Sequence, residues 1–164
     1  MLDYATEKLF KPLGIDTRNA YTARFRPDDP TPFDNAGFGW ATNAQGINIG
    51  VGNLRLRPAD MLKFAQLYLD HRKGHGKQLI PEKWVAAPVA PSPAFSQYGL
   101  MWRMEATPTG DSAYAAMGFG GQLIIVVPKH RLVVAVASQP TKDYATDSED
   151  VFALVSDVIL TTFH

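Results

Sequence analysis

The chain has 164 residues, of which 46% are hydrophobic and 20% are charged, and this composition is typical of one globular domain of ordinary size. Sixteen basic residues balance sixteen acidic ones, so the chain lacks the excess of positive charge that nucleic-acid or anionic-membrane binding requires. The absence of cysteine excludes disulfides and thiolate chemistry, and the longest apolar runs, LIIVVP and LVVAVA, are far too short to span a bilayer.

The first half of the chain combines two helical patterns with a long irregular stretch. Residues 2–13 place leucine and alanine near one helical face, and Pro12 and Gly14 end the pattern. Residues 16–53 are rich in Pro, Asp, Asn and Gly and show little periodicity. Loops of this length within a compact domain are uncommon, and they are usually functional or depend on other structure.

The clearest helical pattern is RPADMLKFAQLYLDHRKG, residues 57–74. Pro58 suits the first helical position, and Asp60 suits the first turn, where the helix dipole favours negative charge. Apolar residues follow at helical spacing, basic residues occupy the predicted last turn, and Gly74 is a typical stop. A shorter helix, PEKWVAAPV, is predicted to begin at Pro81.

The second half of the chain has the patterns of strands. Residues 97–105, QYGLMWRME, partly alternate, whereas QLIIVV and RLVVAVAS are continuous apolar runs joined by PKH, which predicts a hairpin. Runs without a polar face indicate a sheet that is covered on both sides. The last segment, from about residue 147, is predicted to be a helix with Ser148 as its N-cap.

These patterns together predict an α+β fold with an antiparallel β-sheet flanked by helices. We expect the C-terminal helix on one face and the helical segments of residues 1–90 on the other, within one partial domain spanning residues 1–164. Residues 1–90 would supply helices and long loops, and residues 91–164 the sheet and its helix. Three or four strands with one packed helix would leave an apolar face or a strand edge open. The fold is therefore expected to be incomplete.

Three glycines stand out just before the first long apolar run. Gly118, Gly120 and Gly121 lie in AYAAMGFGGQLIIVVP, although an apolar strand does not require glycine. One interpretation is a bend at which glycines relieve crowding. The other is a backbone that a ligand must approach closely, because a side chain there would block it.

The order of segments resembles the C-terminal half of the serine β-lactamase-like hydrolases. The resemblance rests on YATEKLFKPLGI, GVGNLRLRPADMLKFAQLYL, GKQLIPEKWV, YGLMW and AMGFGGQLIIVVPKHRLVVAVAS, followed by a terminal helix. The family includes class C β-lactamases, penicillin-binding proteins, esterases and 6-aminohexanoate-dimer hydrolases. It implies an acyl-enzyme mechanism on a small-molecule ester, amide or peptide-like substrate, and no metal or other cofactor.

The resemblance implies a role for the glycine segment. Gly118, Phe119 and Gly120 take the places of the family's Lys-Thr-Gly motif on an edge strand, and the Gly121 N–H takes the place of an oxyanion-hole donor. The cation of that motif is absent, which disfavours a β-lactam carboxylate and favours ester or amide substrates. Gln122 would point into the cleft or cap the strand. Tyr98, Trp102 and Phe119 would line an acyl pocket, unless they pack in the core or on the sheet.

The family's other two motifs do not occur in this sequence. No serine is followed by lysine three places later, and no tyrosine or serine is followed by asparagine two places later. We therefore expect the chain to be inactive alone, with the nucleophile lying upstream of Met1. The alternative is a non-catalytic binding or assembly module that forms a homo-oligomer or pairs with a separate N-terminal half. The compartment stays open, since a signal for periplasmic or extracellular export would also lie upstream.

The histidines are the remaining candidates for chemistry. His71 and His75 are four residues apart, but Gly74 lies between them and no carboxylate completes a metal site, so an exposed charged loop is expected. His130 lies between Lys129 and Arg131 in the predicted hairpin turn, where a solvated side chain is expected.

Overall fold

The computed structural model describes residues 1–26, 28, 33, 35–70, 73–74, 77–139 and 146–162. They form two compact units, Met1–Asp60 and Met61–His164. The sequence-based division of one domain near residue 90 stays a prediction. His71 and His75 lie outside the described residues.

The first unit contains a helical segment and a two-stranded sheet. Helix α1 (Leu2–Ala5) continues into the π-helical turn η1 (Thr6–Phe10), which ends before Pro12 as predicted. Strands β1 (Phe38–Trp40) and β2 (Leu54–Leu56) pair antiparallel within or beside the stretch predicted to be irregular. Three-residue strands are too short to leave a period in the sequence. The buried ring of Phe10 packs edge-on against Phe38, with the ring centroids 5.0 Å apart.

Helix α3 (Pro58–Leu69) begins at Pro58, as its sequence predicts. Asp60 is buried in the first turn and accepts a hydrogen bond from Arg57 Nε at 3.1 Å. The helix ends at Leu69, earlier than predicted, because Lys73–Gly74 (β3) pairs with Lys77–Gln78 (β4). A short helix follows as predicted, made of α4 (Lys83–Ala86) and the 3-10 turn η2 (Ala87–Val89).

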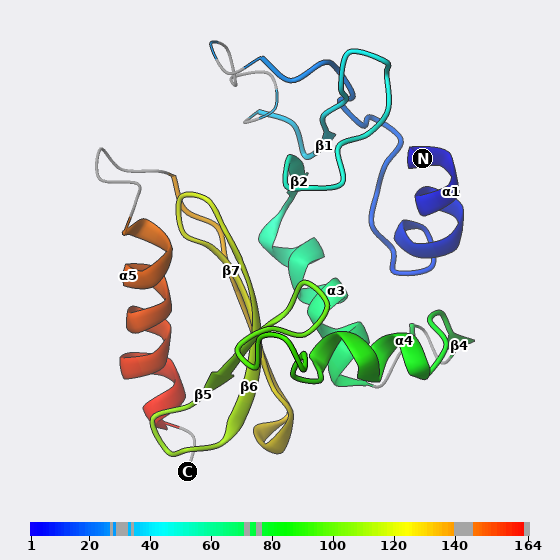
Figure 1. The fold of residues 1–164 in the computed structure, drawn as a ribbon. Coiled ribbons are helices and arrows are strands. Elements are labelled where there is room, and N and C mark those ends of the chain that lie inside the picture. The colour runs from blue at the N-terminus through cyan, green and yellow to red at the C-terminus, as the bar shows by residue number, and fades with distance from the viewer. Residues whose placement is uncertain are drawn as a thin grey trace. The chain divides into compact units, whose positions relative to one another are not determined.

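The second unit contains a four-stranded antiparallel sheet in the order β5-β6-β7-β8 (Figure 1). The strands are β5 (Arg103–Ala106), β6 (Ser112–Gly118), β7 (Gln122–Val127) and β8 (Leu132–Val136). The turn η3 (Pro128–His130) joins β7 to β8, which confirms the predicted hairpin. Strand β5 begins later than the alternating pattern suggests, because Met101 has a φ of 71° that a strand does not accommodate.

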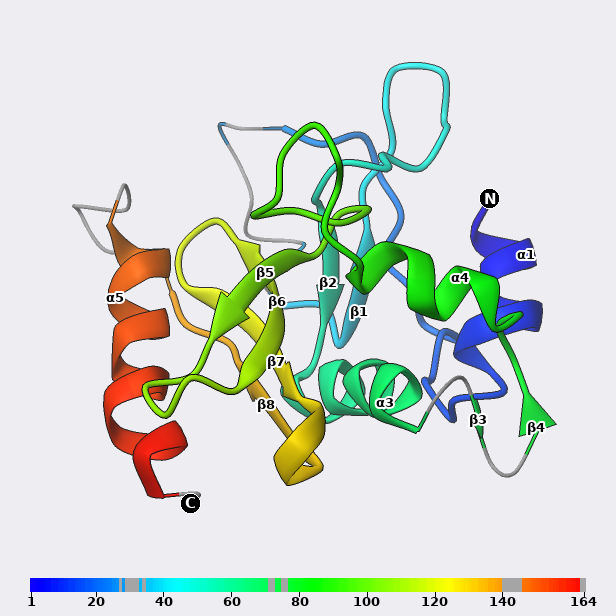
Figure 2. The ribbon, with the colours of Figure 1, turned by 60° about the horizontal axis from the view of Figure 1, so that its bottom comes forward.

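Helices cover both faces of this sheet. Helix α5 (Asp147–Leu154) continues into η4 (Val155–Ile159) and η5 (Leu160–Thr162), and it runs alongside the sheet on the side away from α3 and α4 (Figure 2). The core on the α5 side contains Ala113, Ala115, Leu123, Ile125, Val127, Val155 and Leu160. Each large aliphatic side chain buried here stabilises the fold by about 1.5–3 kcal/mol. The α+β fold with an antiparallel sheet and flanking helices is therefore confirmed.

The start of α5 differs from its prediction. Thr146 is the N-cap, without a side-chain capping bond, and Ser148 is the second residue of the helix. The Ser148 hydroxyl instead donates to the Gly118 carbonyl of strand β6. None of the described helices is long and apolar enough to cross a membrane.

Candidate functional site

The glycine segment forms the turn between β6 and β7. Gly118 pairs with Gln122, which leaves Phe119, Gly120 and Gly121 as a three-residue connection. Gly120 has a φ of 72° and Gly121 a φ of 79°, a region that residues with a side chain rarely adopt. Strands β6 and β7 are the inner strands of the sheet, so the expectation that the glycine segment lies on an edge strand is wrong. It is wrong because residues 103–106 form a further strand on the outer side of β6.

The close approach at Gly121 comes from the chain itself. A Cβ at this position would clash with Ser138 Oγ and lie 2.8 Å from Val151 Cγ2, a side chain of α5. Gly120 and Gly121 are both buried. Glycine is therefore needed at 121 for packing and for backbone conformation, whether or not a ligand also approaches.

Side-chain hydrogen bonds hold the carbonyl groups of this turn in place. Ser148 Oγ donates to the Gly118 carbonyl at 2.6 Å, and Ser138 Oγ donates to the Gly120 carbonyl at 2.5 Å. Gln122 Nε2 donates to the Ser138 carbonyl and, at 3.4 Å, to the Gly120 carbonyl. These bonds fit the strand-capping alternative for Gln122. Both serine hydroxyl protons are engaged by main-chain carbonyls, so neither serine is arranged as an activated nucleophile.

The turn leaves main-chain donors available. Within the described part of the chain, neither the Gly120 N–H nor the Gly121 N–H makes a hydrogen bond, although buried N–H groups are normally paired. Phe119, at the tip of the turn, is 67% exposed. The arrangement can therefore offer the N–H groups of Gly120 and Gly121 from a fixed turn, next to an exposed aromatic ring.

The aromatic candidates lie in two different surroundings. Trp102 is buried, and its ring packs against Phe64, Tyr68 and Tyr114, with a centroid distance of 4.7 Å to Tyr68. These contacts fit the alternative in which Trp102 is a core residue. Tyr98 is 41% exposed and stacks on Phe95, with the ring centroids 5.7 Å apart. Neither ring contact brings these side chains to the glycine turn.

Three ionisable side chains, Arg103, Glu105 and Glu149, form an ion-pair bridge from β5 to α5. Arg103 Nη1 lies 2.7 Å from Glu149 Oε1, and Arg103 Nε lies 2.5 Å from Glu105 Oε1. Burial raises the pKa of the Glu105 carboxyl, although the Arg103 charge opposes that shift. Sequence reasoning did not single out this trio, because its members are far apart in the chain.

His130 is not the solvated side chain that its sequence predicts. Its side chain is 13% exposed, and Nε2 lies 2.7 Å from Asp111 Oδ2. Lys129 Nζ lies 2.6 Å from the other carboxylate oxygen of Asp111. The turn η3 brings both residues to the β5–β6 connection, a contact that no local pattern signals. Among the described residues, no group of His, Cys, Asp or Glu could hold a metal ion.

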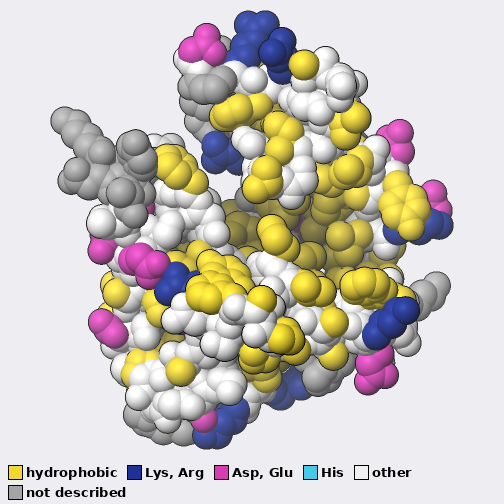
Figure 3. Space-filling view, in the orientation of Figure 1, with side chains coloured by type: hydrophobic (Ala, Val, Ile, Leu, Met, Phe, Trp, Pro, Cys, Tyr) yellow, Lys and Arg dark blue, Asp and Glu magenta, His cyan; other side chains and the backbone are white. Residues whose placement is uncertain are grey.

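Charged side chains are dispersed on the face shown in Figure 3, where Lys and Arg lie in small separate groups. Hydrophobic side chains also reach the surface in several places, including Trp84, Phe95 and Met101. That the chain binds no nucleic acid stays a prediction, and the dispersed charge agrees with it.

Comparison with known proteins gives a family for almost the whole chain. The model of the family described as Beta-lactamase matches residues 1–155. A comparison with curated proteins gave no match.

Solved structures include similar folds. One is a Bacillus anthracis protein proposed to be a 6-aminohexanoate-dimer hydrolase, with a TM-score of 0.54 and 22% identity over 71% of this chain and 32% of that chain. Another is a proposed beta-lactamase of Bacteroides dorei DSM 17855, with a TM-score of 0.43 and 13% identity over 65% of this chain and 41% of that one. The first shows likeness of fold alone. This chain spans about a third of its length.

Proposed function

Because this chain belongs to the beta-lactamase family of serine hydrolases, we propose that it supplies the oxyanion-binding turn of an enzyme that cleaves an ester, amide or peptide-like carbonyl. The observation that carries the proposal is the Gly121 N–H, which has no acceptor within the described residues and lies on a turn of fixed conformation. In this role it donates to the carbonyl oxygen of the substrate as negative charge develops there.

The chemistry follows from that donor. A serine hydroxyl gives up its proton as its oxygen bonds to the carbonyl carbon, and the C=O π electrons move to the carbonyl oxygen. When these electrons re-form the C=O bond, the bond to the leaving group breaks and the leaving group takes up the proton, which gives an acyl-enzyme. Water then hydrolyses the acyl group. One donor to the oxyanion lowers the barrier by roughly 3 kcal/mol. Ser-x-x-Lys is absent from these 164 residues, so the chain contributes the oxyanion side of the reaction and lacks the attacking group.

Substrate preference follows from the tip of the turn. Phe119 is exposed next to Gly120 and Gly121, and Gly118 takes the place at which the family pattern has a cation. An aromatic ring offers apolar contact to an acyl or alkyl group but no charge for a carboxylate. We propose that Phe119 and the Gly118–Gly120 backbone form a wall of the substrate cleft. Uncharged esters and amides are then favoured over β-lactams.

Active-site labelling tests this function. The purified 164-residue chain is expected to resist labelling by a fluorophosphonate and to leave a chromogenic ester and a chromogenic β-lactam unhydrolysed. If reading the coding DNA upstream finds an in-frame Ser-x-x-Lys and Tyr-x-Asn, the longer product is expected to be labelled and to prefer the ester. Turnover by the 164-residue chain that survives further purification would contradict the absence of the nucleophile. A longer product that is not labelled would contradict the hydrolase function itself.

A second candidate function rests on the edges of the sheet. Strands β5 and β8 are its outer strands. Residues 97–98 bond to the start of β5 on its outer side, whereas within the described part of the chain β8 has no partner strand on its outer side. Unpaired edges favour pairing with another chain. We therefore also consider an assembly module that forms a homo-oligomer or pairs with a separate N-terminal half. Measurement of the mass of the chain in solution at increasing concentration tests this role.

A further inference from the structure

The start of helix α5 lies directly against the glycine turn between β6 and β7. Ser148 Oγ donates to the Gly118 carbonyl at 2.6 Å. A Cβ at Gly121 would lie 2.8 Å from Val151 Cγ2 and 3.3 Å from the Asp147 carbonyl oxygen. The conformation of this turn therefore depends on where the start of α5 sits on the sheet.

Arg103 of strand β5 holds the start of α5 from the other side. Its Nη1 lies 2.7 Å from Oε1 of Glu149, which follows Ser148 in the first turn of the helix. Its guanidinium carbon lies 6.0 Å from the centroid of the Phe152 ring. Glu149 and Phe152 are three residues apart and share one face of the helix, so Arg103 contacts that face at two positions.

The same guanidinium contacts the strand that leads into the turn. Arg103 Nη1 lies 3.3 Å from Sδ of Met117, the residue directly before Gly118. Arg103 therefore contacts both of the elements that the hydrogen bond from Ser148 to Gly118 joins. A side chain in this place can fix the spacing between α5 and the end of β6.

Glu105 sets the direction of the guanidinium. Residues 103 and 105 pair with Ala115 and Ala113 of the core on the α5 side, so both side chains lie on that face of the sheet. Glu105 Oε1 lies 2.5 Å from Arg103 Nε, and the Glu105 side chain is 13% exposed. Within the described part of the chain this oxygen makes no hydrogen bond of good geometry, so the contact is electrostatic. Because Nε faces Glu105, Nη1 is left for Glu149, and a lysine with its single nitrogen cannot reproduce both contacts.

We propose that Arg103 is a positioning residue for the oxyanion-binding turn. By holding the start of α5 against β6, it keeps the N–H groups of Gly120 and Gly121 in one orientation. This role rests on the proposed function, because the orientation of these groups matters to catalysis only if they receive an oxyanion. Donors of this kind act because they are oriented before the charge develops, so a turn that moves loses part of its effect while it keeps its N–H groups.

NMR of the 164-residue chain tests the proposal without any catalysis. Arg103→Gln is expected to speed amide exchange at Gly120 and Gly121 about two- to fivefold, in keeping with the loss of a partly exposed ion pair. Arg103→Lys should not restore the wild-type rates, because the role needs two separate nitrogens. In a background of Ser148→Ala, where the bond to Gly118 is already lost, Arg103→Gln should have a much smaller effect on the turn.

Two further variants make the result decisive. Glu149→Gln removes the ion pair at a side chain that is 60% exposed, so it is expected to fold and to speed exchange in the turn as Arg103→Gln does. Arg131→Gln is the matched control, because Arg131 pairs with Asp70 at 3.1 Å and lies at the other end of β7 from the glycine turn. Unchanged exchange in Glu149→Gln, or an equal response in Arg131→Gln, overturns the proposal.

Kinetics of a longer product that a fluorophosphonate labels separate this role from the hydrolase function. Arg103→Gln should lower kcat for the chromogenic ester about three- to tenfold and leave KM nearly unchanged, because the donor is misplaced in the transition state. A raised KM at unchanged kcat overturns the proposal. A longer product that is not labelled contradicts the hydrolase function, whereas amide exchange still decides whether Arg103 positions the turn.

Discussion

Gly99 lies against the backbone of the segment that precedes it. A Cβ at this position would clash with the Pro88 carbonyl oxygen and lie 2.7 Å from the Ala90 carbonyl oxygen. These neighbours are main-chain atoms, and the Leu100 N–H donates to the same Pro88 oxygen at 3.0 Å, so they cannot move aside cheaply. Glycine at 99 is therefore a packing requirement where the chain enters β5.

Gly99→Ala is expected to destabilise the second unit by about 3 kcal/mol, the upper part of the range for overpacking, because backbone must move to admit the methyl group. Urea unfolding followed by circular dichroism measures the change. Gly50→Ala is the control: nothing lies within 4 Å of a Cβ there, so its midpoint should stay close to that of the wild type. Equal midpoints for the two variants would contradict the clash.

Asp111 is a residue at which pH should act on stability, because its carboxyl bonds to two basic side chains. Hydrogen bonds from Lys129 and then His130 lower the pKa of its carboxyl from 3.8 to about 2. A group with a lowered folded-state pKa stabilises the fold above its unfolded-state pKa, and this stabilisation is lost as pH falls through the folded-state pKa. The contribution should therefore be complete above about pH 4 and largely lost near pH 2.

Asp111→Asn should thus be less stable than the wild type at pH 7, and the difference should shrink between pH 4 and pH 2. Urea midpoints at several pH values measure it. Asp157→Asn is the control, since Asp157 is exposed and makes no ion pair among the described residues. A difference that stays constant down to pH 2 would show that the Asp111 carboxylate is not stabilised by its partners.

At the scale of elements, a short hydrogen bond from Ser148 to the Gly118 carbonyl joins helix α5 to the β6–β7 turn. Ser148→Ala is expected to cost about 1 kcal/mol and to speed amide exchange at residues 119–121, because that carbonyl loses its partner. Hydrogen exchange followed by NMR reads both effects. Ser148→Thr, which keeps the hydroxyl, should restore protection. Ser96→Ala, at an exposed loop position, should leave exchange in the turn unchanged.

The elements that the sequence predicts are those with long or well-marked patterns. Pro58 fixes the start of α3, and the two apolar runs around residues 128–130 fix the β7–β8 hairpin. The sequence does not distinguish whether the hydroxyl of Ser148 caps its own helix or reaches another strand, because both need a serine near the helix start. Similarly, three glycines predict a close backbone approach at 121, but not that Ser138 and Val151 make it.

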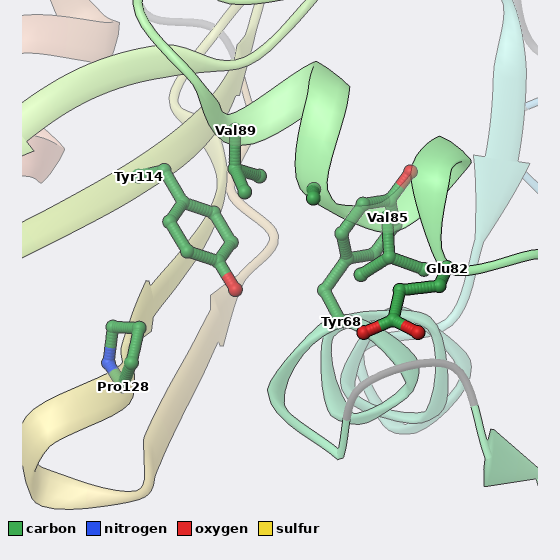
Figure 4. Close-up of a pocket in the computed structure, with 7 residues that line it drawn as sticks. Tyr68, Glu82, Val85, Val89, Tyr114 and Pro128 are labelled. Atoms are coloured by element: carbon green, nitrogen blue, oxygen red, sulfur yellow. The ribbon is translucent and has the colours of Figure 1, made fainter.

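The cavity of about 260 Å³ that Tyr68, Val85 and Tyr114 line (Figure 4) is a further feature that the sequence does not predict. In AYAAMG, the strand pattern predicts that Tyr114 is a packing residue, and its ring does pack on Trp102. Whether its hydroxyl finds a partner depends on α3 and α4, which lie elsewhere in the chain. The family, by contrast, is predicted by the order of many segments, because that order can be recognised even where single residues carry no information.

At the scale of the whole molecule, the open edge of β8 should make the isolated chain associate with itself. Leu132, Val134 and Val136 of β8 pack on the α5 side, which places Ala135 on the opposite face. Backbone groups on the outer side of β8 have no strand partner in the described part of the chain, and such edges tend to pair with one another.

Light scattering at increasing concentration should therefore show a mass rising above 18.0 kDa. Ala135→Lys, which puts a charge on the β8 edge, should keep the chain monomeric, because pairing two such edges would bring like charges together. Ala106→Lys, on the opposite edge strand β5, is the matched control and should still associate if β8 is the edge that pairs. A mass of 18.0 kDa at every concentration would mean that β8 is protected, and an assembly role through that edge would then be excluded.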